Sequence, residues 1–319
     1  MENKNLAYPI QRKWILGVFI IIPLVLAVGL YDYFLNDQAW QPYFSLYSLL
    51  LPLYLLFFEL PHILASFAGF ADGEYARHYR KHLLIGLPVM LLLFGVFAWH
   101  YYLFAIGLYL AITIYHVIRQ QTGIAHMFGV PKGRWHSVWS WSIVIGGALL
   151  FMQLVESRID QALAWLWPVG TSILAIGFIA GVGLIKETKS RLGVWYVVAT
   201  LAMVLTSFLF VQLQYAFLAV LVVRFVHEVT AFMFYITHEM NRNAETIKNK
   251  LYKWLPLLPV SLVIVIPLFA IFGGAVVRNS ISDPKILYMV VMSIALIHYY
   301  MESIMWKRDS LHRQYVQVV

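Results

Sequence analysis

The 319-residue sequence contains no cysteine and few charged side chains. Without cysteine the chain can form no disulfide, no iron–sulfur cluster and no thiolate zinc site, so a bound metal would need histidine, carboxylate or amide ligands. Lys, Arg, Asp and Glu make up 12% of the residues, whereas hydrophobic residues make up 61%. This imbalance exceeds that of a soluble domain, and it predicts an all-α integral membrane protein without a separate soluble module.

Apolar runs long enough to cross a bilayer recur along the whole chain. We predict about ten transmembrane helices in a single membrane domain that covers residues 1–319. The predicted segments are 14–35, 43–70, 83–99, 101–127, 138–156, 163–185, 193–212, 214–239, 254–278 and 285–307. The first run is too long for a signal-peptide core, and no small-residue cleavage site follows it, so we expect a retained helix.

Lys and Arg are distributed unequally over the loops between these segments. If the amino terminus is inside, eighteen of them fall in inner segments and only Arg158, Arg278 and Lys285 fall in outer ones. The positive-inside rule therefore predicts a multi-pass protein of a bacterial-type inner membrane with both termini in the cytoplasm. Because this topology accounts for the net charge of +8, we expect no nucleic-acid partner.

Four of the eleven histidines lie well inside predicted helices that all run from the outer to the inner side. Each lies eight to twelve residues before the inner end of its helix, which is roughly 12–18 Å at 1.5 Å per residue. A single histidine in a membrane helix is often a packing residue bonded to a neighbouring helix. Four at matched depth favour a shared metal site, because ionisable groups are costly there. The four are His62, His116, His227 and His298.

Acidic and amide side chains lie three or four residues from some of these histidines, on the same helix face. They are Glu59, Glu302 and Gln120, which we predict as catalytic groups, as ligands, or as acceptors for the second ring nitrogen of a ligand. Arg119 and Arg224 are expected either to pair with the two acids or to bind substrate.

Other histidines lie closer to the predicted cytoplasmic ends of the helices. His126 and His238 either form a second layer of metal ligands or occupy ordinary interfacial positions. His78 and His82 form a His-x3-His pair in a basic loop, where a solvated surface is the more common role. No role is assigned to His136 and His312.

Four segments resemble the Brp/Blh-like bacterial carotene oxygenases, which are polytopic, histidine-rich and iron-dependent. That family has a Pro-His motif on an early helix, a single histidine on a middle one, a paired-histidine segment, and a late histidine followed by an acid. The matching segments are Pro61-His62, Tyr115-His116, residues 225–238 and residues 297–302. The resemblance implies that His62, His116, His227 and His298 are iron ligands, although residues 63–66 lack the Gly and Asp of the family.

The sequence therefore favours a membrane non-haem iron oxygenase or desaturase that acts on a lipid or isoprenoid and receives electrons from a donor. Membrane fatty-acid desaturases also gather histidines on the cytoplasmic side, but their His-x-x-His-His boxes are absent here. One alternative is a haem-binding electron-transfer protein, and another divalent metal in place of iron also stays open. A metal or proton transporter is a third alternative. It is the weakest, because the outer half carries few polar groups.

Overall fold

The computed structural model describes residues 6–45, 50–152, 165–254, 260–281, 284–307 and 309–319. These residues form helices and no β-strand, and a helix lies at each of the ten predicted segments. Parts of those segments at 46–49, 153–156, 163–164 and 255–259 lie outside the described residues. The longer helices are α2 (Ile21–Leu35), α6 (Leu87–His100), α7 (Tyr102–Ala125), α8 (Arg134–Met152), α9 (Leu166–Glu187), α10 (Arg191–Gln212), α11 (Ala216–Arg242), α12 (Val260–Ser280) and α13 (Pro284–Met305).

Six helices of the described chain are long and apolar enough to cross a membrane. They are Arg12–Leu35, His82–His100, Arg134–Met152, Leu166–Glu187, Arg191–Gln212 and Ala216–Arg242. The all-α class is confirmed, and the six apolar helices support the membrane class. The number of ten crossings and the sides on which the termini lie stay predictions.

The exposed surface of these helices is as apolar as their interior. Leu92 on α6 and Ile179 on α9 are each 66% exposed, whereas Asp32 on α2 is fully buried. Asp32 accepts hydrogen bonds from the side chain of Asn36 at 2.8 Å and from the Tyr215 hydroxyl at 2.8 Å. Such a distribution suits a lipid solvent, because polar groups then find partners only within the protein.

Short helical pieces replace one regular helix between residues 50 and 71. These are α3 (Leu50–Tyr54), a π-helical turn η3 (Leu55–Glu59), α4 (Leu60–Ala68) and η4 (Gly69–Ala71). Pro61 lies two residues after the end of this π turn, and Pro88 lies two residues after the end of a second π turn, η5 (His82–Gly86). Because proline donates no backbone hydrogen bond, the regular i→i−4 ladder is interrupted at both places.

Contacts divide the chain into two compact units. One comprises residues 1–11, 53–106 and 228–319, and the other comprises residues 12–52 and 107–227. Helices α7 and α11 are continuous and contribute to both units. The single membrane domain therefore stays a prediction.

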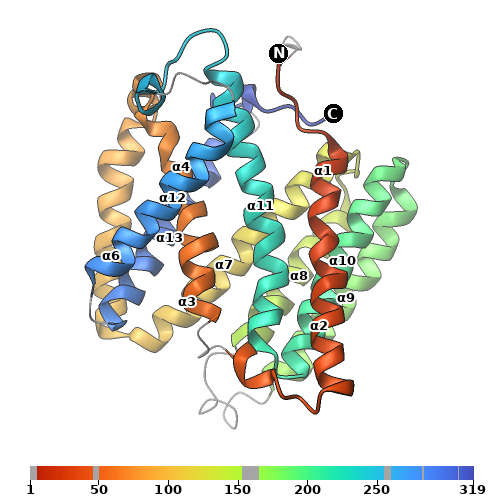
Figure 1. Cartoon of the computed structure of the whole chain (residues 1–319). Helices are drawn as coiled ribbons and strands as arrows, with labels where there is room; N and C mark the ends of the chain where they lie inside the picture. Colours follow the sequence, from red (N-terminus) through yellow and green to blue (C-terminus); the bar gives the residue numbers. More distant parts are fainter. Residues whose placement is uncertain (1–5, 46–49, 153–164, 255–259, 282–283, 308) are drawn as a thin grey trace. The chain divides into compact units, whose positions relative to one another are not determined.

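Within each unit, helices pack closely where side chains are small. In the 107–227 unit, α8 and α9 lie side by side (Figure 1), and a Cβ on Gly146 would come within 2.9 Å of the Gly170 carbonyl oxygen. In the other unit, α12 packs on α4 and α13 packs on α6 (Figure 1). Small residues at such contacts let helices approach without a hydrophobic driving force.

Both ends of the chain belong to the same unit. The Ile10 amide donates to the carbonyl oxygen of Gln317 at 2.8 Å, and the Val319 amide donates to the carbonyl oxygen of Ile10 at 2.9 Å. The C-terminal segment after α13, including the 3-10 turn η8 (His312–Tyr315), is thus fixed to the body of its unit.

Candidate metal centre

Two pairs of predicted ligands are formed, one in each unit. In the first, His62 from α4 and His298 from α13 lie with ring centroids 4.6 Å apart and planes at 80°. Both side chains are buried. The Pro61 interruption and the preceding π turn bring His62 to this position one helical turn after Glu59, which is also buried.

The tautomer of His298 follows from its hydrogen bonds. The Ser66 hydroxyl donates to the carbonyl oxygen of Ile63 at 2.6 Å, so its oxygen must accept from Nδ1–H of His298 at 2.8 Å. Nε2 of a neutral His298 then carries a lone pair, and it lies 3.9 Å from Oε2 of Glu302 one turn later. Two acceptors facing each other at this distance favour a positive charge, either a proton or a metal ion, beside them.

Glu302 is held by two aromatic donors on its other oxygen. Tyr235 on α11 donates its hydroxyl hydrogen to Oε1 of Glu302, and Trp306 donates Nε1–H to the same oxygen at 3.1 Å. Tyr235 also stacks on His62 with centroids 5.7 Å apart and planes at 21°. Tyr235 therefore fixes one carboxylate and one imidazole of this group at once.

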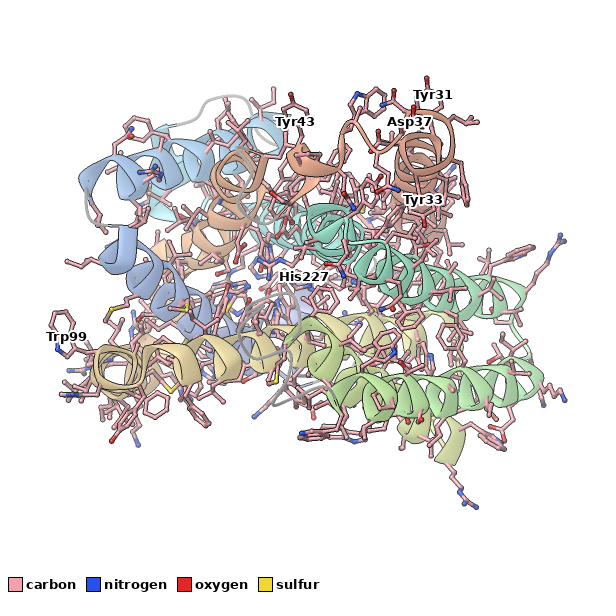
Figure 2. All side chains as sticks on the ribbon, turned by 90° about the horizontal axis from the view of Figure 1, so that it is seen from below. Tyr31, Tyr33, Asp37, Tyr43, Trp99 and His227 are labelled. Carbon is pink, nitrogen blue, oxygen red and sulfur yellow. The ribbon has the colours of Figure 1, made fainter. Side chains whose placement is uncertain are left out.

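The second pair consists of His116 on α7 and His227 on α11. Their ring centroids are 5.0 Å apart with planes at 82°. His227, which is labelled in Figure 2, is fully buried. Nδ1–H of His227 donates to Oε1 of Gln120 at 2.7 Å, which leaves the Nε2 lone pair as the ligating atom. Gln120, which the sequence predicts as catalytic, thus orients His227, as carbonyl acceptors do for metal-bound imidazoles.

The separation within each pair matches two imidazoles on one ion. A metal–nitrogen distance of about 2.0–2.1 Å places the ring centroid about 3.2 Å from the ion. Centroids 4.6 and 5.0 Å apart then correspond to angles of about 90–100° at the metal. That the two pairs meet around a single ion stays a prediction and forms part of the proposal below.

His238, predicted as a further ligand, has both ring nitrogens engaged by protein groups. Nδ1–H donates to Oε1 of Glu239 at 3.0 Å, and Nε2 accepts from the Tyr75 hydroxyl at 2.9 Å. His312, to which the sequence assigns no role, stacks on this group with its centroid 4.0 Å from that of Tyr75 and 4.7 Å from that of His238. We therefore leave His238 out of the proposed ligand set.

Tyr75, His238 and His312 form a C-terminal cluster with Arg242, which donates three hydrogen bonds there. Nε donates to Oδ2 of Asp72 at 2.9 Å, Nη2 to Oε2 of Glu74 at 2.5 Å, and Nη1 to the Tyr315 hydroxyl at 2.7 Å. The bond from Arg242 holds the pKa of Glu74 below its usual value, and burial raises the pKa of Tyr75. The end of α11 and the C-terminal segment are therefore joined by ionic contacts.

Other residues named from the sequence have their contacts outside the two histidine pairs and outside the group around His238. His82 shares a hydrogen bond of 2.7 Å with the Tyr300 hydroxyl, and His78 is exposed. Arg119 donates to the Ser140 hydroxyl at 3.2 Å and lies over the Trp141 ring, so its recorded contacts are with α8. His126 contacts His136.

Several residues around the two pairs escaped the sequence analysis. Ser66 lies four residues after His62, a spacing that places both on one helix face and could have identified it. Glu228 is a fully buried acid directly after His227, and it accepts a hydrogen bond of 2.5 Å from the Tyr54 hydroxyl. Tyr235 and Trp306 gave no local signal, because aromatic residues are frequent throughout the chain.

An apolar pocket lies within the 107–227 unit. Its walls come from α7 to α11, and they include Ile118, Leu174 and Val223. Val223 precedes His227 by one helical turn. The one polar wall residue, Ser207, donates its hydroxyl hydrogen to the Ala219 carbonyl oxygen at 2.8 Å, so the pocket suits a hydrocarbon chain.

No protein-family model, curated protein or solved structure matches this chain.

Proposed function

We propose that the chain is a membrane metalloprotein in which His62, His116, His227 and His298 bind one non-haem iron ion. The observation that supports this most strongly is the bonding of the second ring nitrogen. In His298 and His227, Nδ1–H is committed to a protein oxygen, which leaves Nε2 free of its proton. Four imidazoles, with the Glu302 carboxylate beside His298, form a donor set that suits iron, zinc or copper and disfavours magnesium and calcium.

The number of imidazoles in each pair supports one shared ion rather than one ion for each pair. Two imidazoles alone are fewer than the three or four protein ligands usual for tightly held transition metals. Each unit supplies one pair, so a site of four imidazoles would need both pairs. With four imidazoles, two coordination positions of a six-coordinate ion would remain open, and a fifth protein ligand from Glu302 would leave one.

We further propose an oxygenase or desaturase reaction on a lipid or isoprenoid. Bound iron would supply dioxygen binding and activation, with electrons from an external donor. The chain's own residues hold the imidazoles, set their tautomers and exclude water, while the apolar pocket beside Val223 accepts a hydrocarbon chain. Glu302 is placed to take up or return a proton through Oε2, since Oε1 is engaged by Tyr235 and Trp306.

Neither histidine pair fits the axial ligation of a haem. Axial imidazoles lie on opposite sides of the iron, which separates their centroids by about 6.4 Å. The centroids of the two pairs are 4.6 and 5.0 Å apart, which places both rings of a pair on the same side of an ion. The haem alternative therefore receives no support from these pairs.

The reaction is tested with iron-loaded protein in vesicles made from bacterial membrane lipids. An added one-electron donor and ¹⁸O₂ should give dioxygen consumption with either labelled product or a new double bond, detected by mass spectrometry of the extracted lipids. The His298→Ala protein, reconstituted at the same density, is the control. Iron-loaded wild type that consumes no more dioxygen than this control with any lipid or isoprenoid fraction would contradict the oxygenase proposal while leaving metal binding intact.

A further inference from the structure

A third pair of imidazoles flanks the short connection between α7 and α8, with His126 directly after α7 and His136 in the first turn of α8. The rings of His126 and His136 have centroids 4.2 Å apart and planes at 36°. Both residues belong to the 107–227 unit. His136 is 8% exposed and His126 is half-buried, so the pair is only partly shielded from solutes.

The hydrogen bonds of this pair fix both tautomers. Nδ1 of His126 lies 2.9 Å from the Val130 carbonyl oxygen, and Nε2 of His136 lies 3.1 Å from the Thr122 carbonyl oxygen. A carbonyl oxygen can only accept, so each of these nitrogens carries the hydrogen. Nε2 of His126 and Nδ1 of His136 then carry lone pairs, and no described residue donates a hydrogen bond to either.

The connection is rigid enough to hold the rings in place without a ligand. Gly129 has φ 82°, a left-handed conformation that ends the helical turn, and the Val130 amide donates back to the Ala125 carbonyl oxygen at 3.2 Å. The Thr122 and Ser140 hydroxyls share a hydrogen bond of 3.2 Å that ties α7 to α8. Both carbonyl acceptors are therefore fixed by the backbone.

We infer that His126 and His136 form a second metal site that takes a transition metal ion of the copper class. With the ion about 3.2 Å from each ring centroid, a separation of 4.2 Å corresponds to an angle of about 80° at the metal, which suits adjacent positions. Each ligand has its other N–H on a backbone carbonyl, as metal-bound histidines do.

The charges around the pair exclude hard cations. No described carboxylate contacts either ring, and the charged neighbours of His136 are Arg119 and Lys132. Arg119 is turned towards Ser140 and Trp141 and Lys132 is exposed, so neither covers the ring nitrogens. Neutral nitrogen donors without a carboxylate favour copper, which stands highest in the divalent affinity series. Water would complete the coordination, and with only two protein ligands this site would hold its ion less tightly than a site of three or four.

The test uses the full-length protein in detergent after its four-histidine site has been saturated with iron, because that site would otherwise also take copper. Cu²⁺ is the probe, and electron paramagnetic resonance and equilibrium dialysis are the readouts. The variants are His126→Gln and His136→Gln, and His100→Gln, an exposed histidine, is the matched control. We expect wild type and His100→Gln to bind one Cu²⁺ with coupling to two imidazole nitrogens. Each site variant should bind that ion at least about tenfold more weakly.

Two further measurements distinguish copper binding at this site from iron binding at the proposed iron site. His298→Ala should keep the two-nitrogen copper signal, and His126→Gln should keep its iron. In wild type labelled with ¹⁵N-histidine, the nitrogen coupling should change, a result that does not depend on how any variant folds. Unchanged copper affinity in both site variants, or no histidine coupling in wild type, would overturn the inference whatever the iron content shows.

Discussion

Replacement of His312 by alanine should destabilise the fold without removing the metal. The imidazole is 1% exposed, stacks on both Tyr75 and His238, and shares a hydrogen bond of 3.2 Å with the Tyr79 hydroxyl. Deleting a buried ring of this size costs about 2–4 kcal/mol through lost contacts and the cavity that remains. The unpaired Tyr79 hydroxyl adds roughly 1 kcal/mol, so we expect a total of about 3–5 kcal/mol.

The assay is chemical unfolding in detergent, with metal content measured on the monodisperse fraction. His100→Ala, which removes an exposed histidine of the same unit, is the control and should change stability by less than about 0.5 kcal/mol. If His312→Ala is as stable as this control, the packing argument is wrong. If it is destabilised but also loses metal from the folded fraction, the separation of the C-terminal cluster from the metal centre is wrong.

The same residue predicts how stability depends on pH. Burial lowers the pKa of His312 to about 2, and His238, Arg242 and His78 add to the effect. Below the ordinary pKa of about 6.5 the unfolded chain binds a proton that the folded chain does not, so stability falls as pH falls. Between pH 7 and 5 we expect a loss of about 2 kcal/mol from this group. His312→Phe, which keeps a stacked ring, should show a shallower slope, and an equal slope would contradict the burial of a neutral imidazole.

Three more changes probe the site and the topology. Gln120→Ala should weaken iron binding by about 10–100-fold, measured by competition with a chelator, because His227 loses the acceptor that orients it. Val223→Phe should lower turnover of a long-chain substrate by about tenfold at unchanged iron content, whereas Val182→Phe on an exposed surface should not. Reporter fusions after Lys250 and Pro284 should report opposite sides of the membrane, and a shared side would break the ten-helix topology.

The sequence predicts the helices well because polar or proline-containing stretches separate each apolar run from the next. The tight junctions after His100 and at Gln214 are found as predicted, with φ 64° at Gln214 where the chain turns into α11. The segment around His62 is less regular than predicted. Its π turn depends on how Pro61 packs against neighbouring helices, and periodicity alone does not reveal that.

The histidine pairs are predictable only in part. Depth in the membrane singles out His62, His116, His227 and His298, and the structure pairs the first with the last and the two middle ones with each other. Depth says nothing about the tail after α13. For that reason His312 received no role, although its ring is buried against Tyr75.

The most direct test of the metal centre is the iron-to-protein ratio of monodisperse, detergent-purified protein, measured with its absorption spectrum. The account predicts close to one iron per chain and no Soret band in wild type, with loss of iron in both His62→Ala and His227→Ala, because the two pairs contribute to one ion. A wild-type protein without stoichiometric transition metal would contradict the central claim. Iron that is retained in full by either variant would contradict the shared site.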